Sequence, residues 1–325
     1  MKPKLFLEDV GSLVSATGGK NIWQVNDLGK NPLFKGMSLP EKIYVVDFPG
    51  RGVGQEFLLG RHICGPTKFL MIQQIGHDMI RTFKDHFVGR VAQFVILWGG
   101  RPLDLLAANP PLFHDHLIDT TYIKLTRVED SSVERGWRVV ESSIVGEYWK
   151  DDTWIIMEEC IASGNTLKHF VDEAFKKHKP KKLFIFPVCA SAEGLESINE
   201  ICEKHGVEFV PVLNCAIIQV AEEGVCKPFT DLGLQPRTIV TKNFYTALEK
   251  RYQGSQICWV GDIGDSLYKV HEYLIETLVD MAKLKLDFSK EEFALWNPAV
   301  RSVSFLNKLK KREPEVFEKV VEKIK

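Results

Sequence analysis

Two neighbouring acids, followed by a turn of small and hydroxyl residues, carry the clearest chemistry in this sequence. Glu158 and Glu159 come directly after the apolar run Trp154–Met157. Carboxylates suit the hydroxyl groups of a ribose and a magnesium ion. The turn that follows is built from Ala162, Ser163, Gly164, Asn165 and Thr166.

This turn opens a predicted helix, because apolar residues then recur at helical spacing. The stripe consists of Leu167, Phe170, Val171, Ala174 and Phe175. Gly164 lets the backbone approach an anion closely, and the first N–H groups of a helix favour negative charge. Acids and turn together indicate a sugar phosphate ligand. The alternative is an ordinary strand–turn–helix connection with Ser163 or Thr166 as the helix cap.

The apolar run before the acids predicts a strand covered on both faces. Side chains alternate along a strand, so Glu158 and Glu159 would point to opposite faces if the strand continued. We therefore expect the chain to leave the sheet at Glu158, so that both carboxylates face the crevice beyond the strand ends.

With this pattern of apolar run, two acids and Ile161–Thr166, the chain resembles the phosphoribosyl-diphosphate (PRPP) signature of type I phosphoribosyltransferases. Glu159 stands where that family commonly has Asp. The resemblance implies that Glu158 and Glu159 hold the ribose, directly or through hydrated Mg²⁺. It also implies that Ala162–Thr166 bind the 5′-phosphate of PRPP.

A second segment resembles the pyrophosphate-binding loop of the same family. The strand-like run Phe94–Leu97 ends in Trp98, Gly99, Gly100 and Arg101. Uracil phosphoribosyltransferases carry Arg at the position of Trp98, so we expect Arg101 to supply the charge instead. Taken alone, the two glycines fit a plain turn better than a binding loop.

Two downstream segments are similar to the uracil phosphoribosyltransferase-like branch. Cys189–Leu195 resembles its Ala-rich segment containing Glu-Gly. The other resembles the Gly-Asp-x-Gly-Asp segment that encloses the base, and it implies base-binding roles for Gly261, Asp262, Gly264 and Asp265. Ser266 replaces the Arg with which that branch continues. The alternative is a Gly-Asp turn between a strand and a helix.

Basic residues follow a predicted strand at Thr121–Leu125. In the family, a mobile loop in this region brings basic side chains to the diphosphate, which implies a catalytic role for Arg127. A surface hairpin with ordinary charges is an equal alternative.

The resemblance implies Mg²⁺-dependent transfer of a 5-phosphoribosyl group from PRPP to a nitrogen acceptor such as a nucleobase, and a homodimer. A non-catalytic regulator that senses PRPP or a nucleotide on the same fold remains the alternative. An oxidoreductase using Gly50–Gly54 is disfavoured, because GxGxG lacks the spacing of a dinucleotide site. His114 and His116 fit a solvated loop better than a metal site.

The amino-acid composition indicates which classes of binding partner and which cellular compartment to expect. The chain has 325 residues, is 45% hydrophobic and has a net charge of −1. It therefore lacks the excess of basic residues that is typical of nucleic-acid-binding proteins. Its seven cysteines form no CxxC pair, which predicts a reducing, cytoplasmic compartment. No uncharged apolar run has the length that a bilayer requires, so we expect no membrane partner.

The fold class that these patterns predict is α/β, an open parallel sheet with flanking helices. Residues 1–85 are expected to form an N-terminal extension or hood, with a strand at Lys42–Phe48 and a helix at Lys68–Phe83. Residues 86–285 alternate between strand and helix patterns, as βαβ units do, and form the predicted core. Residues 286–325 form a helical extension whose last helix docks through Val316, Val320 and Ile324.

Overall fold

The computed structural model describes the greater part of the chain. The described residues are 4–50, 52, 54–55, 65–87, 89–97, 118–129, 137–145, 152–220, 229–230, 233–234, 236–252, 275, 278–279, 281–283 and 303–324. The chain divides into two compact units, one of residues 1–59 and 72–260 and one of residues 60–71 and 261–325. Each unit is described by itself.

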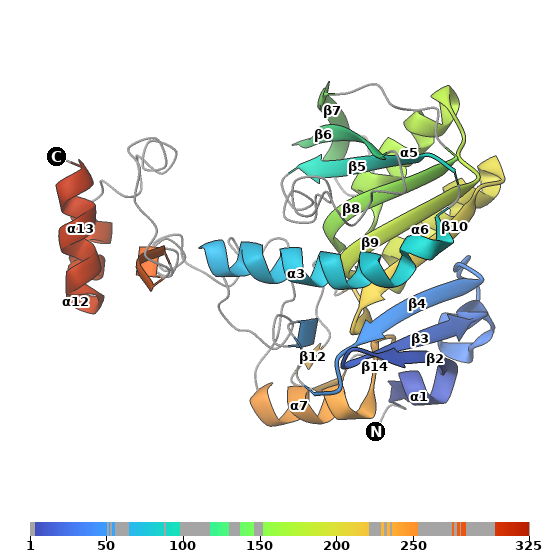
Figure 1. Ribbon diagram of the computed structural model, residues 1–325, viewed down its shortest axis with the longest axis horizontal. Coiled ribbons are helices and arrows are strands. Elements are labelled where there is room, and N and C mark those ends of the chain that lie inside the picture. Colours follow the sequence, from blue (N-terminus) through green and yellow to red (C-terminus); the bar gives the residue numbers. More distant parts are fainter. Residues whose placement is uncertain are drawn as a thin grey trace. The chain divides into compact units, whose positions relative to one another are not determined.

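One large sheet organises the first unit (Figure 1). Its strands, in spatial order, are β2 (Gly11–Thr17), β3 (Lys20–Asn26), β4 (Lys42–Asp47), β10 (Glu208–Asn214), β9 (Lys182–Ser191), β8 (Thr153–Ile161), β5 (Val91–Leu97), β6 (Ile118–Glu129) and β7 (Trp137–Val145). The strands from β4 to β6 run parallel, whereas β2, β3 and β7 pair antiparallel at the two edges. The predicted open parallel sheet is confirmed.

Three short strands and a hairpin complete the β structure. The short strands are β1 (Leu5–Phe6), β11 (Ala216–Ile218) and β14 (Ile239–Val240), and β11 joins the sheet by pairing parallel with the end of β9. The hairpin consists of β12 (Phe229–Thr230) and β13 (Gly233–Leu234).

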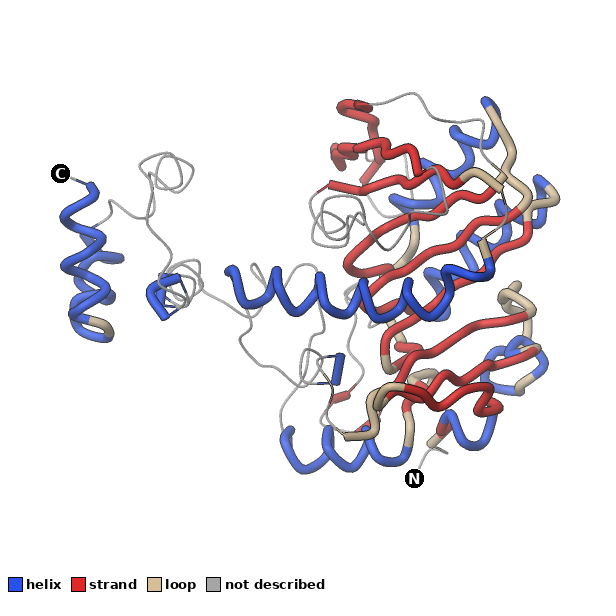
Figure 2. The backbone as a smooth tube through the Cα atoms, viewed as in Figure 1, coloured by secondary structure: helices blue, strands red, loops and turns tan. Residues whose placement is uncertain are grey.

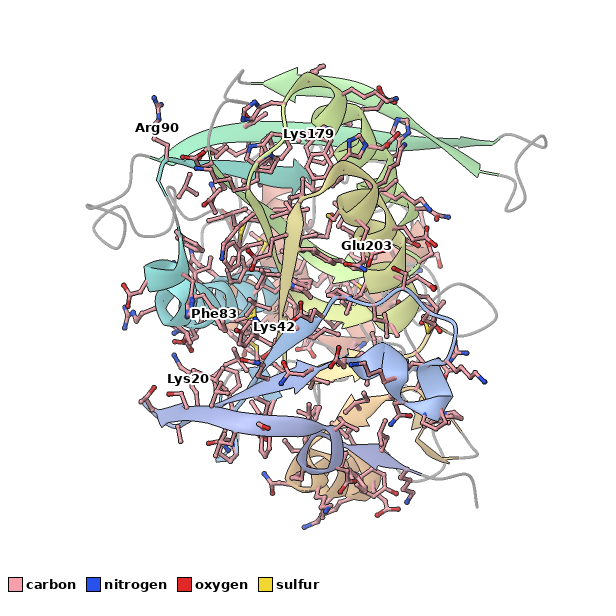
Figure 3. All side chains as sticks on the ribbon, turned by 90° about the vertical axis from the view of Figure 1, so that its right-hand side faces the viewer. Lys20, Lys42, Phe83, Arg90, Lys179 and Glu203 are labelled. Atoms are coloured by element: carbon pink, nitrogen blue, oxygen red, sulfur yellow. The ribbon has the colours of Figure 1, made fainter. Side chains whose placement is uncertain are left out.

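Helices flank both faces of the parallel strands (Figure 2). Those of the first unit are α1 (Leu7–Val10), the part of α3 (Gly65–Phe83) from Ile72 onward, α5 (Asn165–Lys177), α6 (Ala192–His205) and α7 (Lys242–Tyr252), with short 3₁₀ turns η1 (Leu28–Lys30), η2 (Pro32–Phe34) and η3 (Lys84–His86). Figure 3 shows Phe83 of α3 and Glu203 of α6 on opposite sides of the sheet. No helix in the described ranges is both long and apolar enough to cross a bilayer.

Helix α5 packs through the stripe that the sequence predicts. Its buried residues are Leu167, Phe170, Val171, Ala174 and Phe175. Beneath them lies an aromatic layer, in which Phe94 of β5 is 4.8 Å from Trp154 of β8 and 5.5 Å from Phe170, measured between ring centroids. Aromatic pairs at such distances stabilise a core beyond the area they bury, so α5 is held firmly against β5 and β8.

The N-terminal residues contribute directly to the main sheet. The predicted strand at Lys42–Phe48 is β4, and it pairs parallel with β10, for example at Val46 and Asn214. The predicted helix at Lys68–Phe83 is α3. The rings of Phe83 and Tyr44 are 4.9 Å apart, which packs the end of α3 on β4. The domain boundaries at residues 85 and 285 stay predictions.

The second unit has a small core of its own between α12 (Val303–Arg312) and α13 (Pro314–Ile324). Val316 and Val320 are buried there with Phe305 and Leu309, as predicted for the last helix. The side chain of Ile324, the third residue of that prediction, lies outside the described residues. The basic residues at the end of α12 are exposed, as a solvated face requires.

Candidate functional site

The two glutamates lie within strand β8, and one expectation about them is wrong. The chain does not leave the sheet at Glu158, because β9 continues to pair with β8 as far as Ile161. Successive positions of β8 therefore still alternate between the two faces of the sheet at this point. Glu158 is half-buried. The side chain of Glu159 lies outside the described residues.

The turn after β8 makes a sharp entry into helix α5. Gly164 has a φ of 71°, a left-handed conformation that is costly for residues with a side chain. It is also the capping residue of α5, and a glycine has no side chain with which to accept a hydrogen bond from the first turn. The helix therefore begins with a cap position that a bound anion can serve.

Helix α6 holds this turn in place. The Ser191 hydroxyl donates a hydrogen bond to the Ala162 carbonyl, and the Ser197 hydroxyl donates one of 3.0 Å to the Ser163 carbonyl. The turn also lies directly against α6, since a Cβ atom on Gly164 would be 2.7 Å from the Gly194 carbonyl oxygen. These contacts position the turn before any ligand binds.

The start of α6 differs from that of α5. Ser191 caps α6, because its hydroxyl oxygen accepts a hydrogen bond of 2.8 Å from the Gly194 N–H. Helix α5 follows β8, and helix α6 follows β9. Of these two helices, only α5 begins at a residue that has no capping side chain. The positive ends of both helix dipoles add to the potential at the turn.

The order of the strands places this segment at a topological switch point. Chain connections run from β8 through α5 to β9 and through α6 to β10, in one direction across the sheet. The connection from β5 leads to β6, in the opposite direction. Open α/β sheets bind ligands in the crevice where this direction reverses, which is at the carboxyl ends of β5 and β8. Among the described residues, the ladder between these two strands ends at Val95 and Met157, directly before Glu158.

Comparison with known proteins adds distant likenesses. No protein-family model matches the sequence, and no curated protein matches it. The structure is similar to that of the AQ2163 protein from Aquifex aeolicus, with 15% identity over 65% of this chain and 99% of that one and a TM-score of 0.43. It is also similar to a purine phosphoribosyltransferase from Pyrococcus horikoshii, with 17% identity over 44% of this chain and 81% of that one and a TM-score of 0.30.

A third likeness is to the orotate phosphoribosyltransferase of Mycobacterium tuberculosis, with 15% identity over 45% of this chain and 71% of that one and a TM-score of 0.27. Each of these three likenesses has a TM-score below 0.5.

The remaining predicted site residues are described only in part. Trp98, Gly99, Gly100 and Arg101 lie outside the described residues, as do Gly261, Asp262, Gly264 and Asp265. Arg127 does not follow its strand as expected, since it lies within β6 and pairs with Val139 in a β6–β7 hairpin. The β6–β7 backbone corresponds to the hairpin that was the alternative to a mobile loop. The role of the Arg127 side chain stays a prediction.

A buried polar cluster lies at the carboxyl ends of β4 and β10. Asp47 is 1% exposed and accepts a hydrogen bond of 2.9 Å from the Gln55 side-chain amide. Burial raises the pKa of Asp47, although the hydrogen bond from Gln55 opposes this. A Cβ atom on either Gly52 or Gly54 would lie 2.4 Å from the Phe48 ring, so close packing accounts for these glycines without a dinucleotide.

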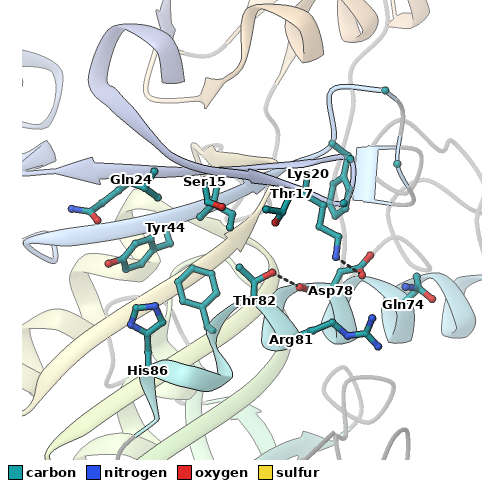
Figure 4. A pocket seen from close by; sticks show the side chains of 18 residues that line it. Ser15, Thr17, Lys20, Gln24, Tyr44, Gln74, Asp78, Arg81, Thr82 and His86 are labelled. Carbon is teal, nitrogen blue, oxygen red and sulfur yellow. Dashed lines mark hydrogen bonds and ion pairs between the residues drawn. The ribbon is translucent and has the colours of Figure 1, made fainter.

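Sequence patterns did not predict the groove that lies between the β2–β3 hairpin and α3 (Figure 4). Its volume is about 1140 Å³, and Tyr44 and Arg81 contribute to its lining. Lys20 reaches across it to Asp78, with 2.5 Å between the ammonium nitrogen and the carboxylate oxygen. No local motif signals such a groove, because its walls meet only through tertiary packing. Within the described ranges, no three His, Cys, Asp or Glu side chains form a metal-binding group.

Proposed function

We propose that this protein transfers a 5-phosphoribosyl group from PRPP to a nitrogen acceptor, a nucleobase or a related compound, and releases pyrophosphate. The observation that carries the proposal is the segment from Glu158 to Thr166. It combines two carboxylates in the last part of β8, a left-handed glycine and a helix start without a capping side chain at the switch point of the sheet. The segments Cys189–Leu195 and Gly261–Asp265 resemble those of the uracil phosphoribosyltransferase-like branch.

The turn is suited to the 5′-phosphate. Gly164 lets the backbone come close to phosphate oxygens, while Ser163, Asn165 and Thr166 supply hydroxyl and amide donors. The helix dipole of α5 favours the negative charge. Because Ser191 and Ser197 already hold the turn, little ordering remains to be achieved when the ligand binds.

The acids are suited to the ribose and to Mg²⁺. A half-buried carboxylate such as Glu158 can accept hydrogen bonds from ribose hydroxyls at the crevice. Mg²⁺ binds through one or two carboxylates together with substrate phosphates and keeps several waters, so an indirect contact through Glu158 or Glu159 fits the donor set. When bound, the ion would neutralise charge on the diphosphate.

The chemistry needs no covalent nucleophile from the protein. The bond from ribose C1 to the diphosphate oxygen breaks, the bond to the acceptor nitrogen forms, and positive charge develops on the ring in between. The chain must therefore hold the ring, stabilise the leaving diphosphate and orient the acceptor. We assign the leaving group to Trp98–Arg101 and Arg127, and the acceptor to Gly261, Asp262, Gly264 and Asp265.

A screen for pyrophosphate release tests the proposal. The full-length protein is incubated with PRPP, Mg²⁺ and single nucleobases, and nucleotide formation is followed by chromatography. We expect one base to give a nucleotide and pyrophosphate in equal amounts, and Glu158→Gln combined with Glu159→Gln to abolish both. PRPP binding without turnover by any base would favour the regulatory alternative. Absence of PRPP binding in calorimetry would refute the site itself.

A further inference from the structure

Two cysteines face each other across neighbouring strands beside the turn. Cys160 of β8 and Cys189 of β9 are direct partners in the parallel register. Their sulfur atoms are 3.5 Å apart, and both are reduced. Cys160 is half-buried, whereas Cys189 is fully buried. Cys160 is thus the more exposed residue of the pair.

This geometry is close to that of a disulfide. Neighbouring strands lie about 4.8 Å apart, which falls within the range of Cα separations that disulfides span. The sulfur atoms need to approach from 3.5 Å to about 2.05 Å, so side-chain rotation and a small displacement of the strands suffice.

The position of the pair connects it to the turn. Cys160 lies between Glu159 and the turn that begins at Ala162. Cys189 lies two residues before Ser191, whose hydroxyl both caps α6 and donates to the Ala162 carbonyl. The turn has little freedom to adapt, because a Cβ atom on Gly194 would already lie 2.5 Å from that same carbonyl oxygen. A displacement of β8 against β9 is thus transmitted to the turn.

We propose that Cys160 and Cys189 form a reversible disulfide that distorts the Ala162–Thr166 turn and weakens the binding of a phosphorylated ligand there. The assignment of the ligand rests on the proposed function, whereas formation of the disulfide and distortion of the turn do not. The pair is a redox-modification site built into the sheet.

The oxidant is a low-molecular-weight disulfide such as glutathione disulfide. The Cys160 sulfur, as its thiolate, attacks one sulfur of the reagent, a mixed disulfide forms, and the first small thiol leaves. The Cys189 sulfur then attacks the Cys160 sulfur and displaces the second small thiol. The protein loses two electrons and two protons, and the reagent becomes two thiols, so the exchange balances.

The experiment uses the full-length protein equilibrated in glutathione buffers of increasing oxidised fraction. Alkylation and peptide mapping follow the disulfide, and amide hydrogen exchange follows the peptide that contains residues 162–168. We expect a Cys160–Cys189 linkage, faster exchange in the turn, at least fivefold weaker PRPP binding, and reversal of all three by dithiothreitol. Cys160→Ala and Cys189→Ala should each abolish the redox response, while Cys202→Ala, which removes a buried thiol of α6, should retain it.

Two results would overturn the inference: no Cys160–Cys189 linkage at any glutathione ratio, or a linkage that leaves exchange in the turn unchanged. If the reduced protein does not bind PRPP, the proposed function fails, but the exchange measurement still decides the switch. Circular dichroism of each variant confirms that a lost response does not come from a lost fold.

Discussion

Gly164 and Gly194 approach each other so closely that neither position has room for a side chain. A Cβ atom on Gly164 would lie 2.7 Å from the Gly194 carbonyl oxygen, and one on Gly194 would lie 2.5 Å from the Ala162 carbonyl oxygen. Both obstacles are backbone atoms, which cannot rotate away. The turn after β8 is therefore fitted against the first turn of α6, and its shape depends on both helices.

Gly164→Ala should disturb the turn in two ways. Its φ of 71° is strained for alanine, and the new methyl group would meet the backbone of α6. We expect a loss of about 1–3 kcal/mol in the free energy of unfolding and at least tenfold weaker PRPP binding. Chemical denaturation and calorimetry measure the two effects.

Gly206→Ala is the matched control, because Gly206 has a φ of 70° but no atom within 4 Å of its added Cβ. It carries the conformational strain alone, so the difference between the two variants isolates the contact with α6. Equal losses of stability in both would show that the contact contributes nothing.

The parts of this site that sequence predicts are those set by local spacing. The stripe from Leu167 to Phe175 repeats at helical period, so α5 and its buried face could be predicted. The continuation of β8 to Ile161 could not be, because it depends on pairing with β9 rather than on the acids themselves. Sheet pairing of β4 with β10 is likewise non-local, so no pattern in the first residues reveals it.

The residues that hold the turn in place could not be predicted from the sequence either. In the sequence, nothing distinguishes Ser191 and Ser197 from other serines near a helix. The fold places their hydroxyls at the carbonyls of residues 162 and 163. The only local signal was the Glu193–Gly194 pair that lies between them, which marked the segment by resemblance and not by mechanism. Residues that bind a ligand leave patterns in sequence, whereas residues that position them become visible only in three dimensions.

Ser191→Ala should destabilise the protein more than Ser197→Ala does. Ser191 both caps α6 and donates to the Ala162 carbonyl, whereas Ser197 donates only to the Ser163 carbonyl. Loss of a cap costs about 1 kcal/mol and loss of a buried hydrogen bond costs a similar amount. We expect losses of about 2 and about 1 kcal/mol respectively in urea unfolding. If Ser197→Ala costs as much as Ser191→Ala, the cap has no separate contribution.

Glu158→Gln should impair phosphoribosyl transfer while leaving the fold intact. Glutamine retains the shape of the half-buried side chain but loses the negative charge that ribose hydroxyls and hydrated Mg²⁺ require. We expect kcat/KM to fall at least 100-fold with the midpoint of thermal unfolding unchanged within a few degrees. Glu173→Gln, on the exposed face of α5, removes the same charge away from the crevice and should have no such effect. Full activity of Glu158→Gln would remove this residue from the proposed mechanism.

Asp47→Asn should stabilise the protein at neutral pH. Burial raises the pKa of Asp47 above its ordinary value of 3.8, so the folded state binds its proton more tightly than the unfolded state does. The stability that this provides is complete below pH 3.8 and is lost as the pH rises through the folded pKa. Asparagine keeps the acceptor for Gln55 and carries no charge, so we expect a higher free energy of unfolding at pH 7 and a flatter pH profile.

Asp172→Asn should change the free energy of unfolding at neutral pH in the opposite direction to Asp47→Asn. Desolvation acts to raise the pKa of Asp172, but hydrogen bonds from Lys204 and His205 outweigh it and leave that pKa lowered. Its contribution is therefore present above pH 3.8 and is lost as the pH falls, so its removal should destabilise the protein at neutral pH. Urea unfolding of both variants between pH 3 and pH 8 makes the comparison. A fall in the unfolding free energy of Asp47→Asn at pH 7 would mean that the ionised carboxylate is favourable in its cluster, contrary to the effect expected from its burial.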